Sequence, residues 1–257
     1  MFEMGLCDRL TKFLTASGAL CKQQHAYQVG RSTTGAARLL KRTVLEHLES
    51  RKRVAAVFFD LSRAFDLVDH NLIANKLEHY GVRGIVLKLL NSFLCDREQS
   101  TDVNNKKSSL VPIGNRSVPQ GSNIGNNMFL ILMNDLPFDS PIVDFIMYAD
   151  DICAIINADT RDQLLANVRY VIDNLSEWFA VNGMLLNLDK TNLVEFNLKK
   201  SQEPAETNSL RSEMECYPYT HNMKSQRHSG VVSHVTLCPG LESALAVRRR
   251  AGAHRES

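Results

Sequence analysis

The chain has 257 residues, 44% of them hydrophobic and 23% charged, a composition typical of a globular protein with a sizeable core. Its net charge of +2, from 30 basic and 28 acidic residues, neither requires nor excludes a nucleic-acid partner. The six cysteines are dispersed, which argues against a secreted disulfide scaffold. No apolar run approaches the roughly 18 residues of a membrane span and no secretory signal opens the chain, so we expect an intracellular protein, nuclear or cytoplasmic, with no membrane partner.

The pattern of hydrophobic residues divides the chain into three parts. Residues 1–52 have a helical pattern, which is clearest over 33–49. Residues 53–198 read as one well-patterned unit. Periodicity is lost in residues 199–257, where Ser, Glu, Pro and His are scattered, so we expect a disordered or poorly packed tail.

The patterned unit opens with a strand followed by helices. A continuous apolar run at 54–59 predicts a strand that is covered on both faces. Asp69 is a good N-cap for a helix that Gly81 should end. A second helix is expected over about 84–94, and an apolar helix around 128–133 follows a loop marked by Pro and Gly.

Two short apolar runs then surround a pair of acids. Residues 145–148 and 152–156 predict a hairpin with Asp150 and Asp151 at its tip. The next helix should begin with a capping box, because a Thr is followed three residues later by a Gln at 160–163.

The unit ends in more strand-like sequence. Asn182 and Gly183 should end the long helix, and residues 185–188 and 192–196 predict a final strand pair. The order of elements predicts an α+β fold, with an antiparallel sheet and helices packed on one of its faces.

Carboxylates stand where these strands end. Asp60 closes the first strand, and Asp150 and Asp151 occupy the hairpin turn. Carboxylates at the rim of a buried strand are rigidly aimed yet reachable by water, which suits Mg²⁺ and its preference for oxygen ligands. Two ions about 3.5–4 Å apart could activate an attacking hydroxyl and stabilise a leaving pyrophosphate. Each acid also has an ordinary structural explanation, because aspartates are common in turns and at strand ends.

The surrounding sequence is more specific than the acids alone. Residues 58–70 read FFDLSRAFDLVDH, which resembles motif A of the reverse transcriptases of non-LTR, LINE-type retrotransposons. Four further segments resemble family segments in the right order: 24–33 (QHAYQVGRST, before motif A), 117–125 (SVPQGSNIG, motif B), 148–151 (YADD, motif C) and 187–191 (NLDKT, motif D). One such segment is weak evidence, whereas five collinear segments are strong evidence.

The resemblance implies roles for particular residues. Asp60, Asp150 and Asp151 would hold two Mg²⁺ ions, for which Mn²⁺ could substitute, and the carbonyl of Leu61 would be a further ligand. Phe65 resembles the aromatic steric gate that excludes a 2′-hydroxyl from the incoming sugar.

Three more positions carry implied roles. Gln120 and Gly121 would line the nucleotide pocket, with the glycine allowing close backbone approach. Lys190 resembles the motif D lysine, a candidate general acid for pyrophosphate departure. A lysine in a turn is otherwise simply solvated, and that explanation stays open.

The resemblance also implies an architecture and partners. Residues 53–198 would be the palm of a right-hand polymerase, and residues 1–52 a partial fingers region. The implied reaction adds deoxynucleotides to a DNA primer 3′ end on an RNA template, with deoxynucleoside triphosphates as substrates.

Departures from the family pattern leave a second hypothesis open. The family usually has Pro and Leu where this chain has Asn126 and Ile124, and we identify neither a basic fingers strand that would clamp the triphosphate nor a thumb. The chain therefore reads as an excised or decayed piece of a longer parent protein that would supply the missing polymerase parts. The alternative is a catalytically silent retrotransposon remnant that keeps the palm fold and at most binds nucleic acid or a protein.

Overall fold

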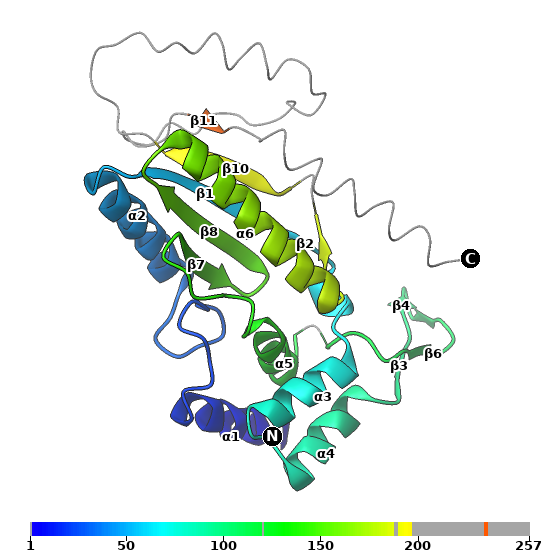
Figure 1. Cartoon of the computed structure of the whole chain (residues 1–257). Helices are drawn as coiled ribbons and strands as arrows, with labels where there is room; N and C mark the ends of the chain where they lie inside the picture. Colours follow the sequence, from blue (N-terminus) through cyan, green and yellow to red (C-terminus); the bar gives the residue numbers. More distant parts are fainter. Residues whose placement is uncertain (1, 120, 188–189, 197–233, 236–257) are drawn as a thin grey trace.

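The computed structural model describes residues 2–119, 121–187, 190–196 and 234–235. Within these residues, five strands form an antiparallel sheet in the order β11-β10-β1-β8-β7 (Figure 1). The strands are β1 (Arg53–Phe59), β7 (Val143–Tyr148), β8 (Asp151–Ala158), β10 (Asn192–Phe196) and β11 (His234–Val235). The apolar strand β1 lies inside the sheet, between β8 and β10.

Successive side chains of β1 point to opposite faces of the sheet, as the geometry of a strand requires. Ala55 and Val57 belong to a hydrophobic cluster with residues of the long helix α6 (Arg161–Val181), and Val54 and Ala56 belong to a cluster with residues of α2 (Thr33–Glu49). All of these strand side chains are buried. The prediction that this strand is covered on both faces is confirmed.

Helices accordingly cover both faces of the sheet (Figure 1). Helix α6 crosses one face and contacts β8 and β1. Helix α2 contacts β7, β1 and β8 from the other face, where its His47 lies 2.7 Å from Asp144 of β7. The predicted α+β class is confirmed, but the expectation of helices on one face was wrong in this detail. The sequence did not reveal this cover, because contacts of α2 such as that between His47 and Asp144 join residues 97 positions apart.

The other helices lie beyond one end of the sheet (Figure 1). They are α1 (Phe2–Ala16), α3 (His70–His79), α4 (Gly84–Leu94) and α5 (Asn123–Met133). The apolar helix α5 packs against both α1 and α3, and its residues from Asn127 to Met133 are all buried. As predicted, the Asp69 carboxylate caps α3, and the Thr160–Gln163 capping box opens α6.

Several short elements were not predicted, and one prediction was wrong. Strand β9 (Leu185–Leu186) pairs with β2 (Leu61–Ser62), and β10 pairs with β1, so among the described residues the expected final strand pair is not formed. A 3-10 helix, η1, spans Ala64–Asp66. Two small pairs, β3 (Arg97–Gln99) with β6 (Val111–Ile113) and β4 (Asp102–Val103) with β5 (Lys106–Lys107), lie away from the main sheet.

The sequence predicted no regular element after residue 199. Strand β11 departs from that expectation, because Val235 pairs with Val194 of β10. The other residues of the expected tail lie outside the described part of the chain. A thumb would follow the palm in this same region. Among the helices of the described residues, none combines the length and the apolar character needed to cross a membrane.

Candidate active site

Strand pairing brings the predicted acids to one end of the sheet. Phe59 of β1 pairs with Ile152 of β8, so Asp60 lies one step beyond that pair, level with Asp151 at the start of β8. Asp150 is in the turn between β7 and β8, where Tyr148 pairs with Asp151. Because the sheet fixes both strands, the acids from β1 and from the hairpin are held as neighbours.

The electrostatics of the acids agree with this placement. Partial burial raises the pKa of Asp151, and the negative charges of Asp150 and Asp60 raise it further. Asp60 and Asp150 are half-buried. In the part of the chain that the structure describes, no three His, Cys, Asp or Glu side chains are grouped tightly enough to hold a metal ion. The three aspartates are thus close enough for their charges to affect one another, but their carboxylates are not close enough together to form a metal site.

The motif D-like segment lies against Asp60. The Asn187 N–H donates a hydrogen bond of 2.8 Å to the Asp60 carbonyl, and the Lys190 N–H donates to the Asn187 carbonyl. The Lys190 Nζ lies 3.9 Å from the Asp60 Oδ2, with 70% of the lysine side chain exposed. Leu188 and Asp189, between these residues, are outside the described residues. Lys190 therefore lies beside the acids and keeps an ammonium group that solvent can reach.

Phe65 belongs to η1, and its side chain packs against α5. Its ring stacks on the ring of Phe129, with centroids 4.3 Å apart and planes 15° from parallel. Phe129 is fully buried, and Phe65 is partly buried. Leu61 is also buried and lies in β2, directly after Asp60. The Phe65 ring thus has a fixed support from Phe129, and it follows the acid Asp60 closely along the chain.

The loop before α5 contains the predicted nucleotide-pocket residues. Gln120 lies outside the described residues. Gly121 has φ +82°, in the left-handed region, and open space surrounds the place of a Cβ. The positive φ accounts for a glycine at this position, and the close approach of its backbone to a nucleotide stays a prediction. Within the protein, the backbone approaches closely at Gly125, where an added Cβ would lie 2.6 Å from the Pro119 carbonyl oxygen.

Sequence reasoning missed the contribution of the segment before α2. Gln24 is buried and its side chain reaches the backbone of Ala149, between Tyr148 and Asp150. Tyr27 also lies near the acids: burial raises its pKa, and the charge of Asp150 raises it further. The available signal was the resemblance of residues 24–33 to a family segment, but that resemblance did not indicate the contact between Gln24 and Ala149.

Comparison with known proteins decides the family. The family model described as reverse transcriptase (RNA-dependent DNA polymerase) matches residues 3–224. The chain belongs to the reverse transcriptase family. The predicted resemblance is confirmed, and its non-LTR character agrees with relatives from mobile elements.

Two relatives of this reverse transcriptase chain come from Drosophila melanogaster. The probable RNA-directed DNA polymerase from transposon BS is 26% identical over 77% of this chain and 22% of its own length. The RNA-directed DNA polymerase from mobile element jockey is 24% identical over 76% of this chain and 22% of its own length. The chain thus spans about a fifth of the length of these curated relatives.

Solved structures support the fold of this reverse transcriptase chain. Telomerase from Candida tropicalis, in complex with the TWJ fragment of telomeric RNA, matches with a TM-score of 0.55 and 12% identity, over 79% of this chain and 35% of that one. The apo telomerase from the same organism, truncated from the C-terminal domain, matches with a TM-score of 0.53 and 15% identity, over 77% of this chain and 40% of that one. At these identities the likeness shows the fold alone, an α+β polymerase palm.

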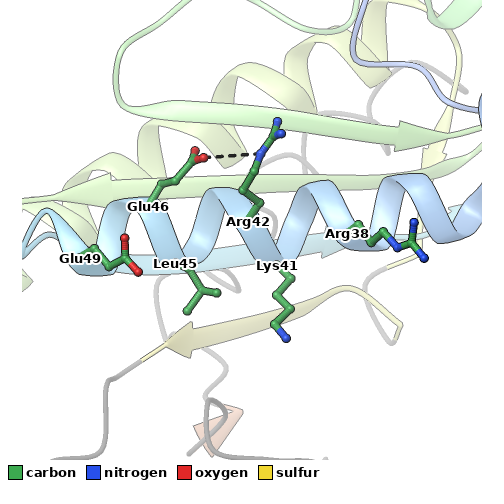
Figure 2. Close-up of a pocket in the computed structure, with 6 residues that line it drawn as sticks. All are labelled: Arg38, Lys41, Arg42, Leu45, Glu46 and Glu49. Atoms are coloured by element: carbon green, nitrogen blue, oxygen red, sulfur yellow. Dashed lines mark ion pairs between the residues drawn. The ribbon is translucent and has the colours of Figure 1, made fainter.

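Two surface hollows in the described part of the reverse transcriptase chain lie away from the acids. One of about 400 Å³ runs along the outer side of α2, where Figure 2 shows Arg38, Lys41 and Arg42 beside Glu46 and Glu49. Arg42 pairs with Glu46 at 3.5 Å, so the charges there partly compensate one another. Another hollow, of about 710 Å³, lies between α1 and α4. Neither is lined by the aspartates at the sheet end.

Proposed function

We propose that the chain is the core of an RNA-directed DNA polymerase that adds deoxynucleotides to a primer 3′ end by two-metal phosphoryl transfer. The observation that carries the proposal is the pairing of β1 with β8, which puts Asp60 beside the hairpin acids Asp150 and Asp151. Family membership supplies the reaction class. The proposal extends to this chain an activity that is named for its longer relatives.

The donor set fits divalent cations. Asp60, Asp150 and Asp151 offer hard oxygen ligands, and the carbonyl of Leu61 would add another. The raised pKa of Asp151 reflects, besides burial, the negative charge of its neighbours, which bound cations would relieve. Two Mg²⁺ ions, or Mn²⁺ in their place, would supply charge stabilisation for the attacking and leaving oxygens. Small side-chain rotations would have to bring the carboxylates together, because they are not grouped as a metal site in the described residues.

Phe65 would select the sugar. A ring that stacks on the buried Phe129 has little freedom to move, so it leaves no volume for a 2′-hydroxyl. Gln120 and Gly121 would line the same nucleotide pocket. The hydrogen bond from the Val118 N–H to the Phe65 carbonyl, 2.9 Å long, ties the loop that carries them to the gate.

Lys190 would act on the leaving group. Its ammonium group is 3.9 Å from Asp60 and largely exposed, so it can turn toward a bound triphosphate. A proton donated from Nζ to the departing pyrophosphate would offset the charge that develops there.

The proposed partners follow from the reaction. They are an RNA template, a DNA primer and deoxynucleoside triphosphates. Residues 53–198 would be the palm and residues 1–52 a partial fingers region. Because the chain spans about a fifth of its curated relatives, a longer parent protein would supply the other polymerase parts.

The alternative is a silent remnant that keeps the palm fold and binds nucleic acid or a protein. The observation in its favour is that, among the described residues, the acids are not grouped as a metal site.

Primer extension on an RNA template with Mg²⁺ or Mn²⁺ tests the proposal. Because the chain spans about a fifth of its curated relatives, we expect extension once the missing polymerase parts are supplied. Asp60→Asn or Asp150→Asn should abolish any extension without unfolding the domain, as judged by circular dichroism. A chimera that supplies fingers and thumb from a longer relative provides the missing parts. If that chimera stays inactive with all three aspartates intact, the remnant explanation holds and the proposed activity is refuted.

A further inference from the structure

Residues 23–25 run beside β7 as an added stretch of parallel backbone pairing. Gln24 and Met147 form a parallel bridge. The Met147 N–H donates to the Gln23 carbonyl and the His25 N–H donates to the Met147 carbonyl, each at 2.8 Å. This pairing brings Gln24 next to the turn that carries the hairpin acids.

The Gln24 side chain then binds both backbone polar groups of Ala149. The Ala149 N–H donates to the Gln24 Oε1 at 2.9 Å, and the Gln24 Nε2 donates to the Ala149 carbonyl at 3.4 Å. The same Oε1 accepts from the Ala26 N–H at 2.9 Å. Gln24 is only 2% exposed, so these bonds are made where water cannot readily replace them.

Ala149 needs such support. Its φ is +55°, in the left-handed region that an alanine rarely adopts. Tyr148 pairs with Asp151, so Ala149 and Asp150 form a two-residue turn, and a positive φ at the first position of such a turn favours glycine. Asp150 lies in this turn and Asp151 directly follows it, so the backbone conformation of the turn sets where their carboxylates point.

The clamp that Gln24 forms on Ala149 is itself braced. The carbonyl of Gln24 accepts hydrogen bonds from the Arg31 Nη1 at 2.9 Å and from the Gln28 Nε2 at 3.1 Å. These bonds fix the backbone of Gln24, and with it the side chain that reaches Ala149.

We infer that Gln24 is a positioning residue, which holds Ala149 in its left-handed conformation and thereby aims the carboxylates of Asp150 and Asp151. The inference rests on the proposed function for its consequence, metal binding, but the clamp itself can be measured separately. Gln24 acts through the turn, because its side-chain bonds go to the backbone of Ala149 and Ala26.

The test compares Gln24→Leu with Asn134→Ala in the full chain. Gln24→Leu keeps similar volume and removes the amide bonds to Ala149. Asn134 is a matched control, because its side chain also bridges two backbone groups of the N-terminal segment, the Cys21 N–H and the Ala19 carbonyl, each at 2.7 Å. Amide hydrogen exchange at Ala149 reports on the clamp, and Mn²⁺ titration followed by electron paramagnetic resonance reports on the carboxylates.

We expect Gln24→Leu to speed exchange at Ala149 and to weaken Mn²⁺ binding by about 10- to 100-fold, the range for loss of a residue that supports metal ligands. Asn134→Ala should leave both unchanged, because the bonds of Asn134 go to Cys21 and Ala19 and not to the turn. Adding Ala149→Gly to Gln24→Leu should restore part of the Mn²⁺ affinity, because glycine adopts positive φ without strain.

Unchanged exchange at Ala149 in Gln24→Leu would overturn the inference, as would equal effects of Gln24→Leu and Asn134→Ala. If Gln24→Leu does not fold, the same comparison is made in the Ala149→Gly background, where the turn needs less support. Failure of the unaltered chain to bind Mn²⁺ would instead refute the metal assignment, while exchange at Ala149 would still decide whether the clamp exists.

Discussion

Phe129→Leu should weaken sugar selection while leaving the fold intact. Phe129 is fully buried and its ring stacks on Phe65 at 4.3 Å, so its replacement removes the support of the proposed gate. Loss of the stacked pair costs about 0.5–1.5 kcal/mol and imperfect repacking up to about 1.5 kcal/mol, so we expect a loss of about 2 kcal/mol. For a chain of this size that lowers Tm by about 4–8 °C.

Phe179→Leu is the matched control. Phe179 is similarly buried and pairs with Phe59 at 6.1 Å, in a ring contact separate from the Phe65 stack. Both variants should lose similar stability in thermal unfolding. If the stack contributes about 1.4 kcal/mol to holding the gate, Phe129→Leu should reduce discrimination against ribonucleotides about tenfold, and Phe179→Leu should not.

The assay is single-nucleotide incorporation, with kcat/KM compared for deoxy- and ribonucleoside triphosphates in the chain or in the extended chimera. In a Phe65→Ala background the gate is already absent, so Phe129→Leu should change the ratio no further. Equal loss of discrimination in the Phe129 and Phe179 variants would refute the reasoning, because it would trace the effect to stability alone.

Other predictions follow from single contacts. Phe65→Ala should admit ribonucleotides while synthesis continues, which the same incorporation assay measures. Lys190→Gln should slow turnover by about 100-fold, and Lys190→Arg should slow it nearly as much, because a guanidinium keeps the positive charge but does not release its proton; full turnover in Lys190→Arg would exclude proton donation. Burial raises the pKa of the Cys153 thiol to about 12, so it should resist alkylation at pH 8 until the chain unfolds, while the exposed Cys95 reacts at once, as mass spectrometry would show.

Local signals predicted the helices well. The Asp69 cap and the Thr160–Gln163 capping box depend on residues within one turn, so their helices begin where the sequence indicated. The hairpin of β7 and β8 was equally accessible, because its two apolar runs and its turn are adjacent in the chain. That hairpin carries Asp150 and Asp151.

Long-range pairing could not be predicted in the same way. The partner of β9 is β2, and the partner of β10 is β1, although β9 and β10 lie near each other in sequence. Hydrophobic pattern defines a strand but does not specify its neighbour, because many partners could bury the same face. The cover that α2 gives to the sheet was missed for the same reason.

The contact between Gln24 and Ala149 gives a physical reason for two of the family-like segments to occur together. Gln24 and Ala149 are 125 residues apart in sequence, yet the one amide side chain binds both backbone polar groups of the turn residue. A turn with a non-glycine residue at positive φ is strained by itself, so its conformation depends on that remote partner. Residues 24–33 and 148–151 therefore act as one structural unit, and a change in the first should be felt at the carboxylates of the second.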